Sequence, residues 1–320
     1  MNMHNSYGSA VLIISYRRFD SLKVILEKCA QNNIKKIYVS VDGPKKNSSE
    51  EFFDNLSIKN VVNEFSRSYS GELFTNYREK NIGCSASILL SCNWIFKFEQ
   101  SAIILEDDCI PADDFFKFAN LSLKYMESKN HIWLACGTQV VQLEKQDSPW
   151  LLSKYPLVWG WATTRDKWNH IFASLLYPRM ISLKEKNPVE RIYWNSGARR
   201  AINGWVDTWD VILAQQMIRQ NKKSIVSSTN LISNIGYDKY ATNVDSSNHI
   251  GLKTSKFEAA GFEPKVNDDF DQWLKKNLYK ISLRHLFTTQ ITRFKDFIRP
   301  KSPKLLPFTT RILISSSTKK

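Results

Sequence analysis

The chain has 320 residues, of which 42% are hydrophobic and 24% charged, the composition of a soluble globular protein with a substantial core. Its five cysteines include no CxxC pair and are odd in number, which favours free thiols in a reducing cytosol over a disulfide framework or a zinc site. We expect no secretory signal, and no apolar run approaches the roughly 20 residues that span a bilayer.

The net charge of +14 is concentrated at one end of the chain. Residues 272–320 hold twelve Lys or Arg and one acid, so this segment carries +11 and residues 1–271 carry only +3. The body is therefore nearly neutral. A basic tail of this kind suits an anionic membrane surface at least as well as nucleic acid.

Strand and helix patterns alternate through the first half of the chain. Short apolar runs with β-branched residues predict strands over residues 10–15, 36–41, 72–76, 102–105, 132–135 and 224–227. Apolar residues at helical spacing predict helices over 20–29, 51–65 and 85–98, a helix that Asp113 or Asp114 caps, and helices over 206–219 and from 268 onward. Strand, helix and strand at this spacing predict an α/β fold with a mostly parallel sheet flanked by helices.

The most informative stretch joins the strand predicted over 102–105 to three carboxylates, Glu106, Asp107 and Asp108. In open α/β sheets ligands bind at the carboxyl ends of the strands, and adjacent carboxylates repel each other unless a cation or donor groups lie among them. A divalent cation such as Mn²⁺ or Mg²⁺, shared with a diphosphate, explains this cluster. The alternative is a solvated acidic loop.

Two further groups of residues are candidates for the site. Trp159 and Trp161 flank Gly160, and their rings either stack on a sugar or pack in the core. Asp210 stands at the head of a predicted helix, where its carboxylate either serves as a base or stabilises the helix dipole. Asp207 is the more natural N-cap of that helix and the alternate candidate for the base.

Ordered motifs between residues 9 and 245 resemble those of the GT-A-fold nucleotide-sugar glycosyltransferases, especially animal N-acetylglucosaminyltransferase I and bacterial family-2-like polysaccharide transferases. The chain departs from the pattern at Arg17, where the animal enzyme has an acid, and in a shorter segment between Trp94 and Glu106. The similar motifs are residues 11–19, 39–42, the DxD-type acidic motif 106–108 with 114–116, 159–161, and 209–210 with 234–236.

The resemblance implies roles for the matching residues. Asp108 would coordinate the metal directly, while Glu106 and Asp107 would meet the ribose, the sugar or metal-bound water. Asp42 would accept a hydrogen bond from the base, with Arg18 nearby. The expected nucleotide-sugar-binding residues are Ser15, Arg18, Asp42, Asn81, Gly83, Glu106 and Asp107, and the expected acceptor-binding residues are Trp159, Gly160 and Trp161.

The resemblance implies a metal-dependent, inverting transfer of a hexosyl or N-acetylhexosaminyl group. The donor would be a nucleotide diphosphate sugar, with a UDP-sugar favoured. The acceptor would be a hydroxyl of a glycan or a lipid-linked molecule in bacterial surface polysaccharide synthesis. The cation would act as a Lewis acid on the leaving diphosphate, and Asp210 would take the proton of the attacking hydroxyl. We expect a cytoplasmic protein, peripheral on the inner face of the plasma membrane through residues 272–320, with no nucleic-acid partner.

The expected domain organisation follows the same resemblance. Residues 1–250 would form the catalytic domain, in which residues 1–137 bind the nucleotide sugar and residues 138–250 hold the acceptor and the base. Residues 251–320 would form a helical, basic C-terminal extension.

Two alternatives remain open from the residues. A two-metal carboxylate nuclease or phosphodiesterase also clusters carboxylates, but it needs Lys and Arg interleaved near Asp108, whereas the basic charge lies in the tail. A non-catalytic sugar-binding module would use the tryptophans without turnover, and its ligand binding would survive Asp108→Ala and Asp210→Asn.

Overall fold

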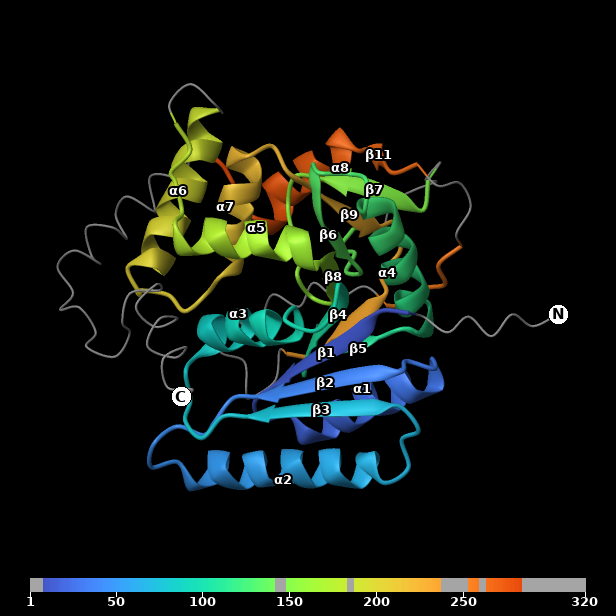
Figure 1. Ribbon diagram of the computed structural model, residues 1–320. Helices are drawn as coiled ribbons and strands as arrows, with labels where there is room; N and C mark the ends of the chain where they lie inside the picture. The colour runs from blue at the N-terminus through green and yellow to red at the C-terminus, as the bar shows by residue number, and fades with distance from the viewer. Residues whose placement is uncertain (1–7, 142–147, 183–186, 237–252, 259–262, 284–320) are drawn as a thin grey trace.

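The computed structural model describes residues 8–141, 148–182, 187–236, 253–258 and 263–283. Its strands are β1 (Ala10–Ser15), β2 (Lys36–Val41), β3 (Glu72–Tyr77), β4 (Ser101–Glu106), β5 (Cys109–Pro111), β6 (Ile132–Cys136), β7 (Trp150–Ser153), β8 (Trp161–Thr164), β9 (Lys223–Ser227), β10 (Ile232–Asn234) and β11 (Lys265–Val266). Nine of them form one sheet in the spatial order β11-β7-β9-β6-β8-β4-β1-β2-β3 (Figure 1). β5 and β10 pair with each other in a separate two-stranded sheet.

The four strands β4, β1, β2 and β3 are parallel neighbours. β8 runs antiparallel to both β4 and β6, and β7 runs antiparallel to β9. The structure therefore confirms the predicted fold class, an α/β protein with a mostly parallel sheet flanked by helices.

Helices cover both faces of this sheet (Figure 1). Residues of α1, α2 and α4 contribute to one buried cluster, and residues of α3, α5, α6, α7 and α8 contribute to the other. The helices are α1 (Phe19–Gln31), α2 (Ser49–Ser66), α3 (Cys84–Ile95), α4 (Asp113–Met126), α5 (Arg165–Leu176), α6 (Pro188–Ile202), α7 (Asp210–Arg219), α8 (Asp268–Trp273) and the π-helical turn η2 (Leu274–Leu278).

The two clusters follow from the side-chain alternation of a strand that is buried on both faces. On β1, Leu12 and Ile14 belong to one cluster, and Val11 and Ile13 belong to the other. Successive side chains of a strand point to opposite faces, so a continuous apolar run indicates helices on both sides. This places the carboxyl end of β1 in the interior of the sheet.

Two predicted helix starts are wrong. Neither Asp113 nor Asp114 caps α4, because Ala112 holds the cap position and makes no side-chain cap hydrogen bond. Both aspartates lie in the first helical turn and have other partners: Asp113 Oδ1 lies 2.8 Å from Lys28 Nζ, and Asp114 Oδ2 accepts the Phe257 backbone N–H at 3.0 Å.

The helix predicted over 206–219 begins four residues later, at Asp210. The N-cap position belongs to Trp209 and not to the predicted Asp207. Asp207 instead accepts hydrogen bonds from α3, a contact that local sequence does not reveal.

Part of the predicted C-terminal extension packs on the body of the protein. β11 pairs parallel with β7, and the side chains of Phe270 and Leu274 are 0% exposed. A domain boundary at residue 250 stays a proposal, but residues 265–281 contribute to the main sheet and its core. Residues 284–320 lie outside the described residues. Within the described ranges, no helix combines the length and the apolar character that crossing a membrane requires.

Candidate functional site

A cleft of about 1210 Å³ opens where the carboxyl ends of β1, β2 and β4 meet. The loop between β3 and α3 and the segment before α7 complete its wall. The residues come together because neighbouring parallel strands end at the same edge of the sheet. All the residues predicted to bind the nucleotide sugar and the metal line this cleft: Ser15, Arg18, Asp42, Asn81, Gly83, Glu106, Asp107 and Asp108.

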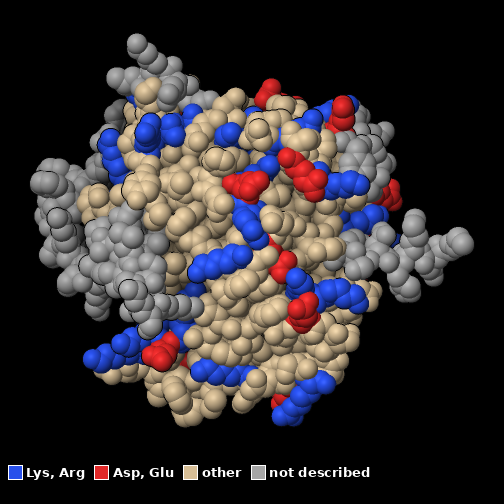
Figure 2. Space-filling model, viewed as in Figure 1, with Lys and Arg blue, Asp and Glu red and all other residues tan. Residues whose placement is uncertain are grey.

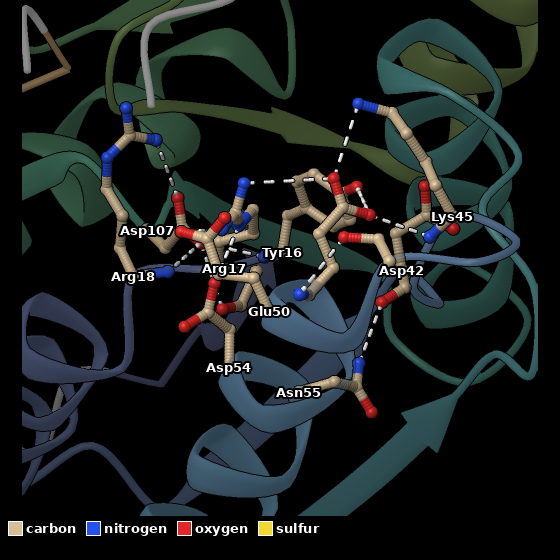
Figure 3. Close-up of polar contacts among 12 residues, drawn as sticks. Tyr16, Arg17, Arg18, Asp42, Lys45, Glu50, Asp54, Asn55 and Asp107 are labelled. Atoms are coloured by element: carbon tan, nitrogen blue, oxygen red, sulfur yellow. Dashed lines mark hydrogen bonds and ion pairs between the residues drawn. The ribbon is translucent and has the colours of Figure 1, made fainter. Parts of the chain in front are cut away.

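Asp107 is a buried connector between β4 and the loop after β1 (Figure 3). Its Oδ2 accepts hydrogen bonds from Ser15 Oγ at 3.0 Å and from the Tyr16 backbone N–H at 2.7 Å. The Arg18 backbone N–H lies 3.4 Å from the same oxygen, and Arg18 Nη1 lies 3.4 Å from Oδ1. The side chain therefore fixes the shape of the loop, which is a positioning role that the sequence did not predict.

Asp42 holds the loop that follows β3. Its carboxylate accepts the Gly43 N–H at 3.0 Å, Asn81 Nδ2 at 3.0 Å and the Ile82 N–H at 3.2 Å. Burial raises the pKa of Asp42 to about 7, and the positive charge of Arg78 opposes this rise. The predicted contact of Asp42 with a nucleobase stays a prediction, since the chain's own donors already meet both oxygens.

Arg78 is the cation beneath this loop. Its guanidinium donates to Ser40 Oγ at 3.0 Å and to Ser91 Oγ at 3.2 Å. Burial lowers the pKa of Arg78, and Asp42 opposes that shift. The pair places opposite charges on the two sides of the loop, so each charge lowers the free energy of burying the other.

The wall beside Asp107 is fixed by acids from α2 (Figure 3). Arg17 Nε lies 2.7 Å from Asp54 Oδ2, and Arg17 Nη2 lies 2.8 Å from Glu50 Oε1. Tyr16 Oη donates to Glu51 Oε2 at 2.6 Å. The acids on α2 therefore hold the Arg17 guanidinium in place.

Asp108 and Glu106 are less engaged with the chain's own donors. Asp108 Oδ1 accepts the Cys109 thiol at 3.2 Å, and its Oδ2 lies 3.8 Å from Arg18 Nη1. Burial and the Asp107 charge raise the pKa of Asp108. No described residue donates a hydrogen bond to the Glu106 carboxylate. Burial and the Asp108 charge raise the pKa of Glu106 well above its usual range.

The space beside Asp108 depends on a glycine. A Cβ added at Gly236 would lie 2.2 Å from Asp108 Oδ2. The Ile235 backbone N–H donates to the Asp108 carbonyl at 2.9 Å, so this backbone is tied to the acidic strand end. Because Gly236 carries no side chain, the Asp108 carboxylate fits beside its backbone.

The two candidate bases have different surroundings. Asp207 lines the cleft, and its carboxylate accepts the Cys84 N–H at 3.0 Å and the Ser85 N–H at 3.2 Å. Asp210 opens α7, where its Oδ1 accepts the Val211 N–H at 2.9 Å and a hydrogen bond from the Thr208 hydroxyl. Asp210 is not among the residues that line the cleft, but its charge contributes to the raised pKa of Glu106.

The predicted acceptor residues do not line the cleft. Trp161 is 1% exposed and packs against Trp209 and Trp168, with ring centroids 5.5 and 6.0 Å apart. This burial corrects the prediction that the Trp161 ring stacks on a sugar. Gly160 has a φ of +68°, so it makes a turn that other residues adopt only with strain. Trp159 is partly exposed and packs against both core clusters.

The cleft lining also contains residues that were not predicted as part of the site, among them Tyr16, Lys45 and Trp205. Tyr16 and Lys45 come shortly after the ends of β1 and β2, and this position at the carboxyl ends of parallel strands is the sequence feature that could have identified them. Trp205 follows Gly204 in the connection between α6 and α7, and it is 41% exposed.

The fit of a divalent cation rests on Asp108 and its neighbours. The described residues contain no group of three His, Cys, Asp or Glu side chains placed to hold a metal ion. The Asp108 carboxylate nevertheless faces the cleft with 23% of its side chain exposed, beside a Glu106 carboxylate to which no residue of the described ranges donates. Hard cations take oxygen ligands, and Mg²⁺ commonly uses one or two carboxylates together with substrate phosphates. The donor set fits a cation whose remaining ligands come from a diphosphate and water.

No protein-family model matches the chain, and no curated protein matches it in sequence. Among solved structures, it is similar to 4-diphosphocytidyl-2C-methyl-D-erythritol synthase from Anaerococcus prevotii, with 11% identity, 57% of this chain and 82% of that chain covered, and a TM-score of 0.31.

Two other solved structures are similar at the same level. The inositol-1-phosphate CTP transferase from T. maritima shows 10% identity over 68% of this chain and 85% of that chain, with a TM-score of 0.34. Glucosyl-3-phosphoglycerate synthase from Mycobacterium tuberculosis, in complex with Mn²⁺, UDP-glucose and phosphoglyceric acid, shows 11% identity over 49% of this chain and 57% of that chain, with a TM-score of 0.28. Likenesses this weak transfer no activity to the chain.

The raised pKa of Asp42 predicts a pH-dependent stability. The folded-state pKa of about 7 exceeds the reference value of 3.8, so the folded form binds more protons between these two values. The contribution of Asp42 to the free energy of unfolding is therefore largest below about pH 4 and declines as the pH rises toward 7. Asp42→Asn stays neutral, so its stability relative to the wild type should increase over this range in urea unfolding. A difference that does not vary with pH contradicts the prediction.

Proposed function

We propose that the chain is a metal-dependent glycosyltransferase that moves a sugar from a nucleotide diphosphate sugar, with a UDP-sugar favoured, to a hydroxyl group. The observation that carries this proposal is the cleft at the carboxyl ends of β1, β2 and β4, which gathers the acidic triplet, Arg18 and the Asp42–Asn81 pair. The motif resemblance assigned the same residues to one donor site, although they lie far apart in the sequence.

The chain's own residues supply the binding groups for such a donor. The Arg18 guanidinium is held beside the acidic triplet by Asp107 and is placed to pair with a diphosphate. Asn81 and the backbone of the loop 79–83 border the cleft beside Asp42. A cation on Asp108 would supply Lewis-acid neutralisation of the leaving diphosphate.

Asp210 is the proposed general base. Both oxygens of the alternate, Asp207, accept backbone N–H groups of α3, which stabilises the ionised carboxylate but occupies it with a structural contact. Asp210 stands at the start of α7, and among the described residues the Thr208 hydroxyl and the Val211 N–H donate to its Oδ1 and none donates to its Oδ2. A single carboxylate that takes the proton of the attacking hydroxyl is consistent with direct displacement and inversion.

Charge does not separate this proposal from a nuclease, because Arg17, Arg18, Lys45, Lys46 and Lys80 line the cleft together with its acids. On the face in Figure 2, basic and acidic side chains of the described residues are interspersed in the same way. The ligand count favours the transferase, because a two-metal site needs several shared ligands and the described part of the chain holds no three-residue metal-binding group. A sugar-binding module without turnover remains the alternative, and the Asp210 variant below distinguishes it from an enzyme.

The metal proposal predicts cation-dependent nucleotide binding. Calorimetric titration with UDP should give a lower dissociation constant with Mn²⁺ than without it, because a cation held by Asp108 would neutralise the charge of the diphosphate. Asp108→Asn should bind UDP with the weaker, Mn²⁺-independent affinity. Asp20→Asn, which changes an exposed carboxylate on α1, is the matched control and should behave as the wild type. If the wild type has the same dissociation constant for UDP with and without Mn²⁺, the metal-dependent part of the proposal is wrong.

The base proposal predicts a loss of turnover without a loss of binding. Asp210→Asn should lower kcat by about 10²–10⁴-fold, the usual contribution of a positioned base, and should leave the UDP dissociation constant unchanged. The measurement is UDP release from a panel of nucleotide sugars with Mn²⁺ present. Asp166→Asn removes the corresponding first-turn acid of α5 and should retain full turnover. Equal rates for wild type and Asp210→Asn would assign the base elsewhere.

We also propose that the basic tail contacts an anionic membrane, which would place the enzyme at the inner face of the plasma membrane beside a lipid-linked acceptor of surface polysaccharide synthesis. Residues 284–320 hold nine Lys or Arg and one acid. A chain ending at residue 283 keeps α8 and η2 and should sediment less with phosphatidylserine vesicles than the full chain, because the tail supplies the electrostatic attraction. Equal sedimentation of the two chains would exclude this contact.

A further inference from the structure

The segment 203–209 joins α6 to α7 and contributes to the wall of the cleft. α6 ends in a Schellman motif, in which the Gly204 N–H donates to the Ala201 carbonyl at 3.0 Å and the Trp205 N–H donates to the Arg200 carbonyl at 2.9 Å. Gly204 has a φ of +73°, which glycine adopts without strain. The end of α6 therefore fixes the backbone at Trp205.

A second contact holds the same segment against α3. The two hydrogen bonds from Cys84 and Ser85 to Asp207 use the first two backbone N–H groups of α3, which have no partner within that helix. A carboxylate at this position also interacts favourably with the helix dipole. Asp207 and Cys84 are 123 residues apart in sequence, so this contact ties the segment to the loop that Asp42 holds.

Between these two anchors the Trp205 indole stays in the cleft and is 41% exposed. A hydrophobic residue at this position of a Schellman motif commonly packs back onto its own helix. The chain buries its neighbouring tryptophans, since Trp209 is 2% exposed and Trp161 is 1% exposed. An indole with a fixed backbone is a preorganised flat surface, which loses little conformational entropy when a ring stacks on it.

We propose that Trp205 is a sugar-stacking residue of the acceptor site and that Asp207 is the positioning residue that holds it over the cleft. The inference rests on the proposed glycosyltransferase function and names a binding residue within it. A pyranose ring presents an apolar C–H face that fits an indole, and its hydroxyl rim needs hydrogen-bond acceptors such as the nearby carboxylates.

The position of Trp205 favours the acceptor over the nucleobase. Asp42 binds the Ile82 N–H and Asp207 binds the Cys84 N–H, so the two carboxylates grip the chain on opposite sides of Gly83. The donor base is proposed at the Asp42 side. Trp205 lines the cleft together with Asp207, in the connection that leads to the proposed base Asp210, and this is where we place the ring that carries the attacking hydroxyl.

The test uses the full chain labelled with 5-fluorotryptophan at its ten tryptophans and followed by ¹⁹F NMR. Trp205→Phe and Trp159→Phe identify the two resonances by their disappearance. Methyl pyranosides of the common hexoses and N-acetylhexosamines are then added at millimolar concentrations. At least one of them should shift the Trp205 resonance, while the resonance of Trp159, the residue predicted from sequence, should stay in place. No shift of the Trp205 resonance with any pyranoside overturns the proposal.

Two further variants separate this inference from the donor site. Trp205→Ala should change the dissociation constant of UDP with Mn²⁺ by less than about twofold, whereas a loss of UDP binding would assign the indole to the nucleobase and overturn the acceptor role. Asp207→Ala should reduce the pyranoside-dependent shift of the Trp205 resonance while UDP still binds, and an unchanged shift removes the positioning role. If the wild type does not bind UDP, the proposed use of a UDP-sugar donor is rejected. The proposal for Trp205 is then decided separately, by whether a pyranoside shifts its ¹⁹F resonance.

Discussion

Asp107 ends a buried central strand and turns its carboxylate back onto the loop that follows the neighbouring strand, where Ser15 and Tyr16 donate to one oxygen. Because Asp107 is buried, removing these donors would leave its charge with only the longer contacts to Arg18. The contact fixes the loop that carries Arg18. The cleft keeps its shape because this carboxylate is fully used by the protein.

The carboxylates around the cleft divide into two groups by their partners. Asp42, Asp107 and Asp207 accept backbone N–H groups and hold loops in place. Glu106 and Asp108 have few donors of their own, and burial raises the pKa of each. Occupied acids shape the site, and the others are available to a cation or substrate. The motif resemblance treated members of both groups as ligand contacts, because sequence carries no record of which carboxylate already has donors.

The sheet could be predicted from sequence because its strands are short apolar runs, which indicate burial on both faces. The residues that meet in the cleft could also be predicted, since the ends of neighbouring parallel strands lie at one edge of the sheet. The surroundings of the tryptophans could not be predicted. Trp161 and Trp205 are both tryptophans next to a glycine, and only tertiary packing buries the first and leaves the second in the cleft. The role of Asp207 depends on a contact across 123 residues, which local capping rules cannot anticipate.

The nine-stranded sheet runs without a break from β3 to β11, because β8 pairs with both β4 and β6. A continuous ladder of backbone hydrogen bonds leaves no hinge about which the two halves could rotate as rigid bodies. In the proposed enzyme, substrate entry and product release would then proceed by rearrangement of connections such as 79–83 and 203–209. Asp42, which accepts the Ile82 N–H, and Asp207, which accepts the first two N–H groups of α3, would limit how far these connections open. Opening of this kind is local, so the rate of exchange at the cleft is governed by a few hydrogen bonds and not by the stability of the whole fold.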